Sequence, residues 1–132
     1  MGAQRVNIDG VGRLPAFSHA VIAGQHLHVS GMLGADAELQ LVEGGIRAET
    51  TRTLENLARI IAGCGGTFAD VVKVNVHLTD MADFAAMNEA YLEFVGDDPP
   101  ARITTGTTAL ALGAAVEMDC IAYREDGWSA PV

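Results

Sequence analysis

The sequence has little positive charge and few aromatic residues. It contains 8 Lys and Arg against 17 Asp and Glu, which gives a formal net charge of −9, and aromatic residues make up 5% of the chain. A nucleic-acid-binding surface needs clustered cations to replace the counterions of the phosphates, and aromatic rings on which bases stack. Because the few cations are scattered, we expect no nucleic-acid partner and favour small molecules instead.

Long apolar runs and paired cysteines are missing too. No stretch approaches the ~18 apolar residues of a membrane span, and the first residues lack the apolar core of a signal peptide. The two cysteines, Cys64 and Cys120, form no CxxC pair, and neither is expected at a helix start, where a thiolate is stabilised. We therefore expect a cytoplasmic protein with free, packed thiols and no membrane partner.

The chain is apolar for its size. Hydrophobic residues are 49% of its 132 residues, and a chain of this length forms one core. We predict one domain over residues 1–132 whose apolar patches are covered by further copies of itself.

Apolar periodicity predicts a hairpin, two helices and three further strands. The hairpin turns at Gly24-Gln25 and pairs Ala23 with His26. The helices are expected near 49–62 and 83–95, and the strands near 71–78, 102–110 and 115–124. In the strand VVKVNVHL, the residues expected to face the core are Val72, Val74, Val76 and Leu78. The order predicts an α+β fold in which both helices cover one face of a sheet of five or six strands, leaving the other face to another subunit.

One arginine stands where a substrate could be held. Arg102 follows a Pro-Pro corner at the start of a strand, and Thr104 shares its face. Glu117 lies on the neighbouring strand if the strands at 102–110 and 115–124 form a hairpin. A guanidinium offers a two-pronged donor to a carboxylate, and a nearby carboxylate could orient or deprotonate a water. Alternatively, Arg102 and Glu117 simply pair with each other or lie in solvent.

A histidine-rich face is the rival candidate. The hairpin places His19, His28 and Ser30 close together, with His26 near them, and three histidines could bind a metal. The sequence has no HExxH, HxxxH or CxxC motif, so we favour solvent-facing or interface histidines and expect no metal. Ser30 also lacks the strand-to-helix elbow of a catalytic serine, which argues against a Ser-His-Asp triad.

Several segments together carry a family resemblance. These are AFSHAVIAG, HLHVSGMLG, the long stretch from ETTRTLENLARIIAGCGG through DVVKVNVHLTDM to NEAYLEFV, PPARITT and AAVEMDCIAY. Over nearly its full length the chain resembles the RidA (YjgF) family of reactive-intermediate deaminases. The resemblance implies a chorismate-mutase-like α+β fold and a homotrimer with a barrel-like centre and three clefts between subunits. It also implies hydrolysis of 2-imino and 2-enamino acids to 2-oxo acids and ammonia, without a cofactor.

The resemblance also assigns residues position by position. Arg102 matches the arginine that grips the substrate carboxylate, and Glu117 matches the glutamate associated with the attacking water. Thr104 falls where many members have cysteine, and its main chain is expected to contact substrate or water. The positions that match other site-lining residues of the family are Ser30, Gly31 and Asn88. The helical position of Asn88 by itself predicts only an amide that hydrogen-bonds an adjacent loop.

Three departures from the family pattern concern the substrate. Phe17 stands at a site-lining position where archetypal deaminases have tyrosine, so a hydroxyl is missing, and Met32 replaces a frequent glutamine. The segment TALALGAAVE lacks the usual Leu-Pro. We expect the carboxylate grip to be retained and the substrate or rate to differ.

The favoured hypothesis is a trimeric imine/enamine deaminase. One alternative is a ligand-binding or chaperone-like member with little turnover, and another is a pathway-specific hydrolase that acts on a larger imine. The older family label of endoribonuclease is disfavoured by the net charge of −9.

Overall fold

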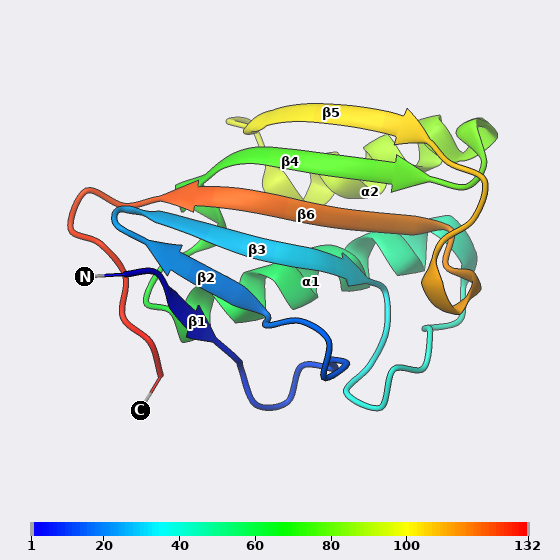
Figure 1. Ribbon diagram of the computed structural model, residues 1–132. Coiled ribbons are helices and arrows are strands. Elements are labelled where there is room, and N and C mark those ends of the chain that lie inside the picture. Colours follow the sequence, from blue (N-terminus) through cyan, green and yellow to red (C-terminus); the bar gives the residue numbers. More distant parts are fainter. Residues whose placement is uncertain (1, 132) are drawn as a thin grey trace.

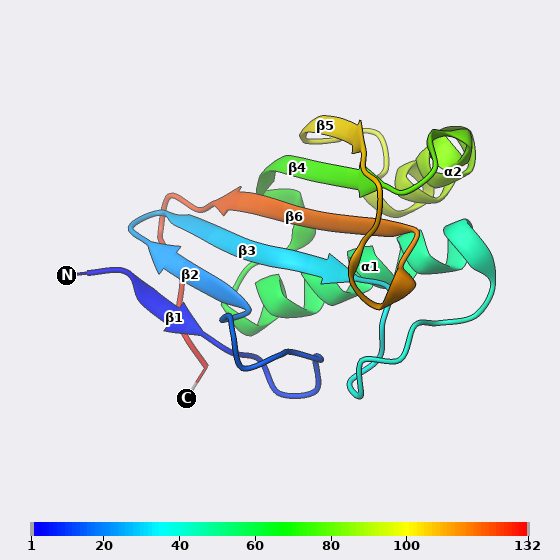
Figure 2. The ribbon, with the colours of Figure 1, turned by 45° about the vertical axis from the view of Figure 1, so that its right-hand side comes forward.

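The computed structural model describes residues 2–131 and contains one six-stranded sheet with two helices packed on one of its faces (Figures 1 and 2). The strands are β1 (Gln4–Val6), β2 (Ala20–Ala23), β3 (His26–Leu33), β4 (Val71–Leu78), β5 (Ala101–Gly106) and β6 (Val116–Tyr123). The helices are α1 (Gly45–Gly63) and α2 (Phe84–Val95), with short 3₁₀ turns η1 (Phe68–Asp70), η2 (Met81–Asp83) and η3 (Ala111–Gly113). The expected α+β fold is confirmed.

The strand order differs from the one expected around Arg102 and Glu117. The order across the sheet is β1-β2-β3-β6-β4-β5. All neighbours are antiparallel except β4 and β5, which run parallel and are joined through α2, because parallel neighbours need a crossover connection. β5 forms one edge of the sheet, and β4 separates it from β6 (Figure 1). The expected hairpin of the strands that carry Arg102 and Glu117 is therefore wrong.

The first hairpin has the expected register. Ala23 pairs with His26 and Val21 with His28, and the Ser30 amide donates to the His19 carbonyl at 2.9 Å. Gly24 has a φ of 60°, which glycine adopts without strain. The turn and the alternation of apolar residues thus set this register locally.

The core lies between the helices and the covered sheet face. Alternate residues of β6 are buried there: Val116, Met118, Cys120 and Ala122. In β4 the same alternation begins only at Val74. Val72 is 44% exposed because the strand bulges: Val71 pairs with Ala122 but Lys73 pairs with Ile121, so Val72 is the additional residue. The expectation that Val72 faces the core is wrong.

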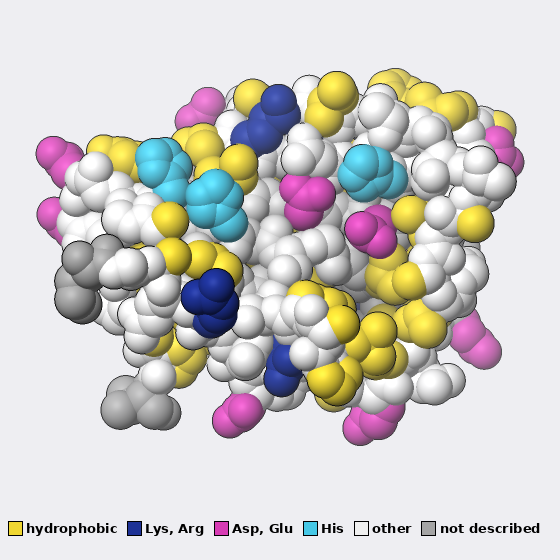
Figure 3. Space-filling view, viewed as in Figure 1, with side chains coloured by type: hydrophobic (Ala, Val, Ile, Leu, Met, Phe, Trp, Pro, Cys, Tyr) yellow, Lys and Arg dark blue, Asp and Glu magenta, His cyan; other side chains and the backbone are white. Residues whose placement is uncertain are grey.

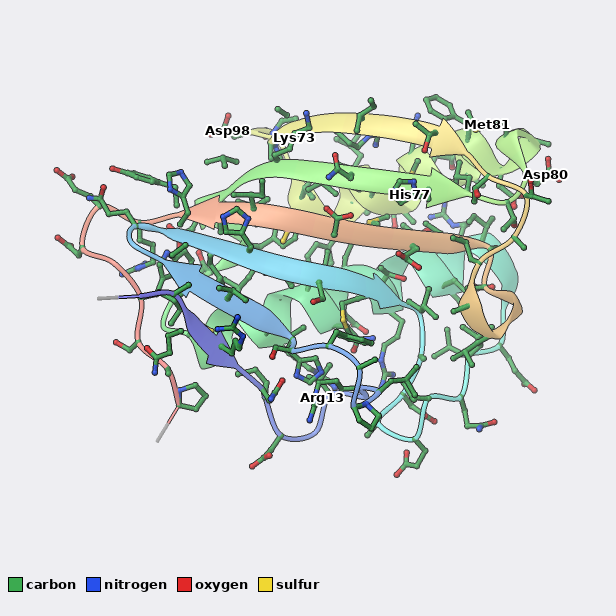
Figure 4. All side chains as sticks on the ribbon, in the orientation of Figure 1. Arg13, Lys73, His77, Asp80, Met81 and Asp98 are labelled. Atoms are coloured by element: carbon green, nitrogen blue, oxygen red, sulfur yellow. The ribbon has the colours of Figure 1, made fainter. Side chains whose placement is uncertain are left out.

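The other sheet face is open and polar along its middle (Figure 3). Lys73 and His77 extend from β4 on this face (Figure 4). Asn75 donates to Asp119 at 2.8 Å, and the His77 ring lies 2.9 Å from the Thr105 hydroxyl. Within residues 2–131 no helix is long and apolar enough to cross a membrane.

Candidate active site

Arg102 is held by one face of α2. Its Nη2 donates to the amide oxygen of Asn88 at 2.6 Å, and its Cζ lies 4.8 Å from the ring centroid of Tyr91 and 5.8 Å from that of Phe84. These three partners occur at i, i+4 and i+7 of the helix, so they share one side of it. The guanidinium is therefore held in place by side chains of the same chain.

The surroundings of Arg102 form a shallow hollow of about 300 Å³. Pro99, Pro100 and Asn88 are among the residues that line it. The fixed φ of the prolines limits the freedom of the chain just before Arg102. The hollow thus presents a restrained cation at the edge of the sheet.

Two hydroxyl groups near Arg102 are buried without a partner in the described chain. They are the Tyr91 hydroxyl and Thr104 Oγ1. Burial raises the pKa of Tyr91, and the nearby positive charge of Arg102 opposes that shift only in part. Thr104 shares the inner face of β5 with Arg102, as the sequence predicts, because the two are two residues apart on one strand.

Glu117 borders a different, larger cavity of about 400 Å³. The walls of this cavity come from the loop before β2, from β3, from the loop before α1, from α1 itself, from η3 and from β6. They include Phe17, Ser30, Gly31 and Glu117, which are four of the expected site residues.

A bulge in β3 brings Gly31 against Glu117. Val29 pairs with Cys120 but Met32 pairs with Met118, so β3 has one residue more than β6 between these pairs. A Cβ placed on Gly31 would lie 2.5 Å from Oε2 of Glu117. Glycine at this position therefore leaves the space that the carboxylate occupies.

The loop that carries Phe17 is tied down by hydrogen bonds. The backbone amide of Ile8 donates to Nδ1 of His19, and Nε2 of the same ring lies 3.0 Å from the Gly12 carbonyl. Ser30 Oγ donates to the carbonyl of Ser18 at 2.6 Å. These contacts fix the loop against the sheet, so Phe17 is presented on a rigid wall.

Glu117 is the free polar group of this cavity. Ser30 is bonded as described, the Asn56 amide nitrogen donates to two carbonyls, and the Asp36 carboxylate accepts from two backbone amides. Among the described residues, the Glu117 carboxylate has no hydrogen bond and no ion pair, although the backbone of Glu117 pairs with β3 and β4. Its carboxylate can therefore accept a proton or a hydrogen bond from a bound molecule.

The expected site residues fall into two groups. We call Arg102, Thr104 and Asn88 the arginine half-site, and Phe17, Ser30, Gly31 and Glu117 the glutamate half-site. The two cavities share no lining residue. The alternative that Arg102 pairs with Glu117 does not hold, because Arg102 pairs with Asn88 and the two strands are separated by β4.

The rival histidine face does not form as one group. His19 is 1% exposed, and both of its ring nitrogens are used inside the chain, which removes it from a three-histidine site. His26 and His28 remain exposed, with ring centroids 6.5 Å apart. Across residues 2–131 no group of three His, Cys, Asp or Glu side chains could hold a metal ion.

Tyr91 and Phe84 were not identified as site residues from the sequence. Both lie at apolar positions of the expected helix near 83–95, a pattern that by itself indicates core residues, although Phe84 is 38% exposed. Their spacing from Asn88 on one helix face is the signal that could have linked them to Arg102.

Comparisons with known proteins agree with the fold. The model of the family described as Endoribonuclease L-PSP matches residues 11–124. A RutC family protein of Pyrococcus abyssi is 39% identical over 110 residues, which cover 83% of this chain and 87% of the relative. The rat protein named 2-iminobutanoate/2-iminopropanoate deaminase is 38% identical over 110 residues, which cover 83% of this chain and 80% of the rat protein. The crystal structure of RidA from an Antarctic Psychrobacter superposes with a TM-score of 0.86 at 36% identity. The match covers 92% of this chain and 99% of the Psychrobacter chain.

Proposed function

This chain belongs to the RidA family, and we propose that it hydrolyses 2-imino and 2-enamino acids to 2-oxo acids and ammonia. The observation that carries the proposal is the pairing of a restrained cation with an uncommitted carboxylate. Arg102 is held by Asn88 and Tyr91, while Glu117 has no partner among the described residues. The relatives that are named imine deaminases support the same chemistry.

Arg102 binds the substrate carboxylate in this proposal. Its Nη2 is engaged by Asn88, and the other guanidinium donors remain to form a two-pronged contact with the substrate. Asn88 is then a positioning residue for the cation. The main chain around Thr104, on the same strand, borders the bound substrate.

Glu117 acts on the attacking water. A protonated imine is already electrophilic, so hydrolysis needs a positioned water rather than a protein nucleophile, a metal or a cofactor. The water oxygen bonds to the imine carbon while Glu117 accepts a proton from the water, which gives a carbinolamine. Glu117 returns that proton to the nitrogen. It then accepts the hydroxyl proton of the carbinolamine as the carbon–nitrogen bond breaks, so that ammonia leaves and the carbonyl of the 2-oxo acid forms.

The two half-sites meet between subunits of a homotrimer in this proposal. Exposed apolar side chains border both half-sites: Phe17, Leu14 and Leu112 around Glu117, and Phe84 and Met81 near β5. These surfaces differ from each other, so their contact is heterologous, and in a homotrimer three such contacts form a closed ring. Each ring interface then joins the Arg102 of one copy to the Glu117 of the next.

The reaction is tested with imines that are generated in the assay mixture. An amino-acid oxidase with catalase generates the 2-imino acid from alanine or leucine, and a semicarbazide trap reports the imine that remains. The parent protein should accelerate both loss of trapped imine and release of ammonia. Unchanged imine decay with folded protein present would overturn the proposal.

A separate experiment tests whether each active site is shared between two subunits. Arg102→Ala and Glu117→Gln each disable every cleft of a homotrimer, but a mixed trimer contains some clefts with both native residues. Co-expressed in equal amounts, the two variants should recover about a quarter of the parent activity, because one cleft in four receives both native side chains. Activity no higher than that of the separate variants would show that the clefts are not shared.

A ligand-binding role with little turnover is the second candidate. It is favoured by Phe17, which brings no hydroxyl to the wall of the glutamate half-site. Calorimetry with a stable 2-oxo acid separates the two functions: binding without imine hydrolysis favours this candidate.

A further inference from the structure

Two leucines adopt a backbone conformation that is unusual for leucine. Leu39 has a φ of 63° and Leu112 a φ of 60°, and no other non-glycine residue within the described range 2–131 has a positive φ. Side chains with a Cβ are disfavoured there, so the surrounding structure must hold these positions. Both leucines line the same cavity, the one that Glu117 borders.

The rest of that cavity is also apolar. Phe17 and Leu14 stand at its rim with Leu112, all three partly exposed, and Met32 lies at its floor at 6% exposure. The polar side chains in its wall are bonded to the protein, with the exception of Glu117. A bound molecule therefore meets apolar walls and a single free carboxylate.

From this arrangement we propose that the cavity holds the side chain of the imino acid and selects branched aliphatic or aromatic side chains. The inference rests on the proposed deaminase function and adds the substrate class. The volume of about 400 Å³ lies within the range of small-molecule sites and accommodates an isobutyl or benzyl group.

Polar and acidic side chains are excluded by the same walls. A carboxylate would lose its water, and the polar side chains of the described cavity wall have no free donor to replace it. An acidic side chain would also approach Glu117, whose negative charge repels it. Small side chains would leave most of the cavity unfilled, and each missing methylene lowers the rate of reaction at low substrate concentration.

The proposed side-chain selectivity is tested with a panel of imines generated in the assay mixture from alanine, leucine, phenylalanine and glutamate. The expected kcat/KM is at least about tenfold higher for the leucine and phenylalanine imines than for the alanine imine, and lowest for the glutamate imine. Equal kcat/KM across the panel would overturn the selection and leave deaminase activity standing. Hydrolysis of none of the imines would instead overturn the proposed function itself.

The role of the strained leucines is tested with Leu112→Gly. Glycine adopts the positive φ without strain, so the variant keeps its backbone while losing the side chain at the cavity rim. The ratio of kcat/KM for the leucine imine to that for the alanine imine should fall about fivefold or more. The matched control is Leu110→Ala, in the same loop but outside the cavity lining, and it should keep the parent ratio. An unchanged ratio in Leu112→Gly, with a parent-like circular dichroism spectrum, would overturn the proposal.

Discussion

The arginine half-site and the glutamate half-site are built in opposite ways. Arg102 contacts three side chains from one helix, all of which lie within residues 84–91. Glu117 faces a cavity whose walls come from several segments that are distant in the sequence, and its carboxylate has no partner among them. One half-site holds its charged group in place, and the other leaves it free.

In the proposed reaction, that difference separates substrate binding from catalysis. A guanidinium that is already restrained loses little side-chain entropy when it binds a carboxylate. A carboxylate that is already bonded would have to break that bond before it could act on water. We therefore expect changes around Arg102 to affect substrate affinity more, and changes around Glu117 to affect turnover more.

Glu117→Gln should have the largest effect. An amide cannot accept the proton of the attacking water, and general base catalysis contributes about 100-fold or more. We expect kcat to fall by that factor with little change in KM, measured as ammonia release from the imine. A variant that binds more weakly but turns over at the parent rate would remove Glu117 from the chemistry.

Gly31→Ala provides a control on position rather than charge. Its Cβ would take the space of the Glu117 carboxylate, so kcat should fall while the carboxylate itself remains. A fully active Gly31→Ala would show that the observed position of the carboxylate is not needed.

Arg102→Ala should have the next largest effect. A hydrogen bond to a charged group contributes ~1.5–3 kcal/mol, which corresponds to a loss of about tenfold to 150-fold in kcat/KM. Arg102→Lys should recover only part of the loss, because an ammonium cannot make the two-pronged contact. If Arg102→Ala assembles normally and works as fast as the parent, the arginine is structural.

Replacement of Tyr91 should have a smaller effect on the same half-site. Tyr91→Leu removes the ring that lies 4.8 Å from the guanidinium, and a cation–π contact of ~0.5–1 kcal/mol corresponds to a KM about two- to fivefold higher. Tyr91→Phe keeps the ring and removes a hydroxyl that has no partner in the described chain, so its KM should match the parent value. Equal KM values for the Leu and Phe variants would contradict a positioning role for the ring.

Alkylation of the cysteines should have the smallest effect. Burial, with a smaller contribution from Asp119, raises the pKa of Cys120 to about 12. A raised thiol pKa favours the neutral form, so at pH 8 only about one thiol in ten thousand is the reactive thiolate. Cys64 is buried as well, and burial raises its pKa. Iodoacetamide at pH 8 should leave activity unchanged, and inactivation of the native protein would contradict this prediction.

The sequence by itself determined the elements and their buried faces. The alternation in β4 identified Val74, Val76 and Leu78 as core residues, and Gly24 marked the hairpin turn. Such patterns are local, because a strand repeats every two residues and a helix every 3.6. The face that Arg102 shares with Thr104 followed from the same period. Arg102, Thr104 and Glu117 were candidates from their position and chemistry, and the family resemblance added the other expected site residues.

Only the tertiary structure decided how these elements meet. β6 lies between β3 and β4, which moves Glu117 away from the strand of Arg102 and divides the expected site into two half-sites. The pairing of strands depends on contacts between distant segments, and hydrophobic periodicity does not specify which neighbour a strand takes. The bulge that exposes Val72 and the left-handed conformations of Leu39 and Leu112 have the same origin. Each is a local departure from regular geometry that depends on packing against distant segments. Hydrophobic periodicity therefore does not predict these departures.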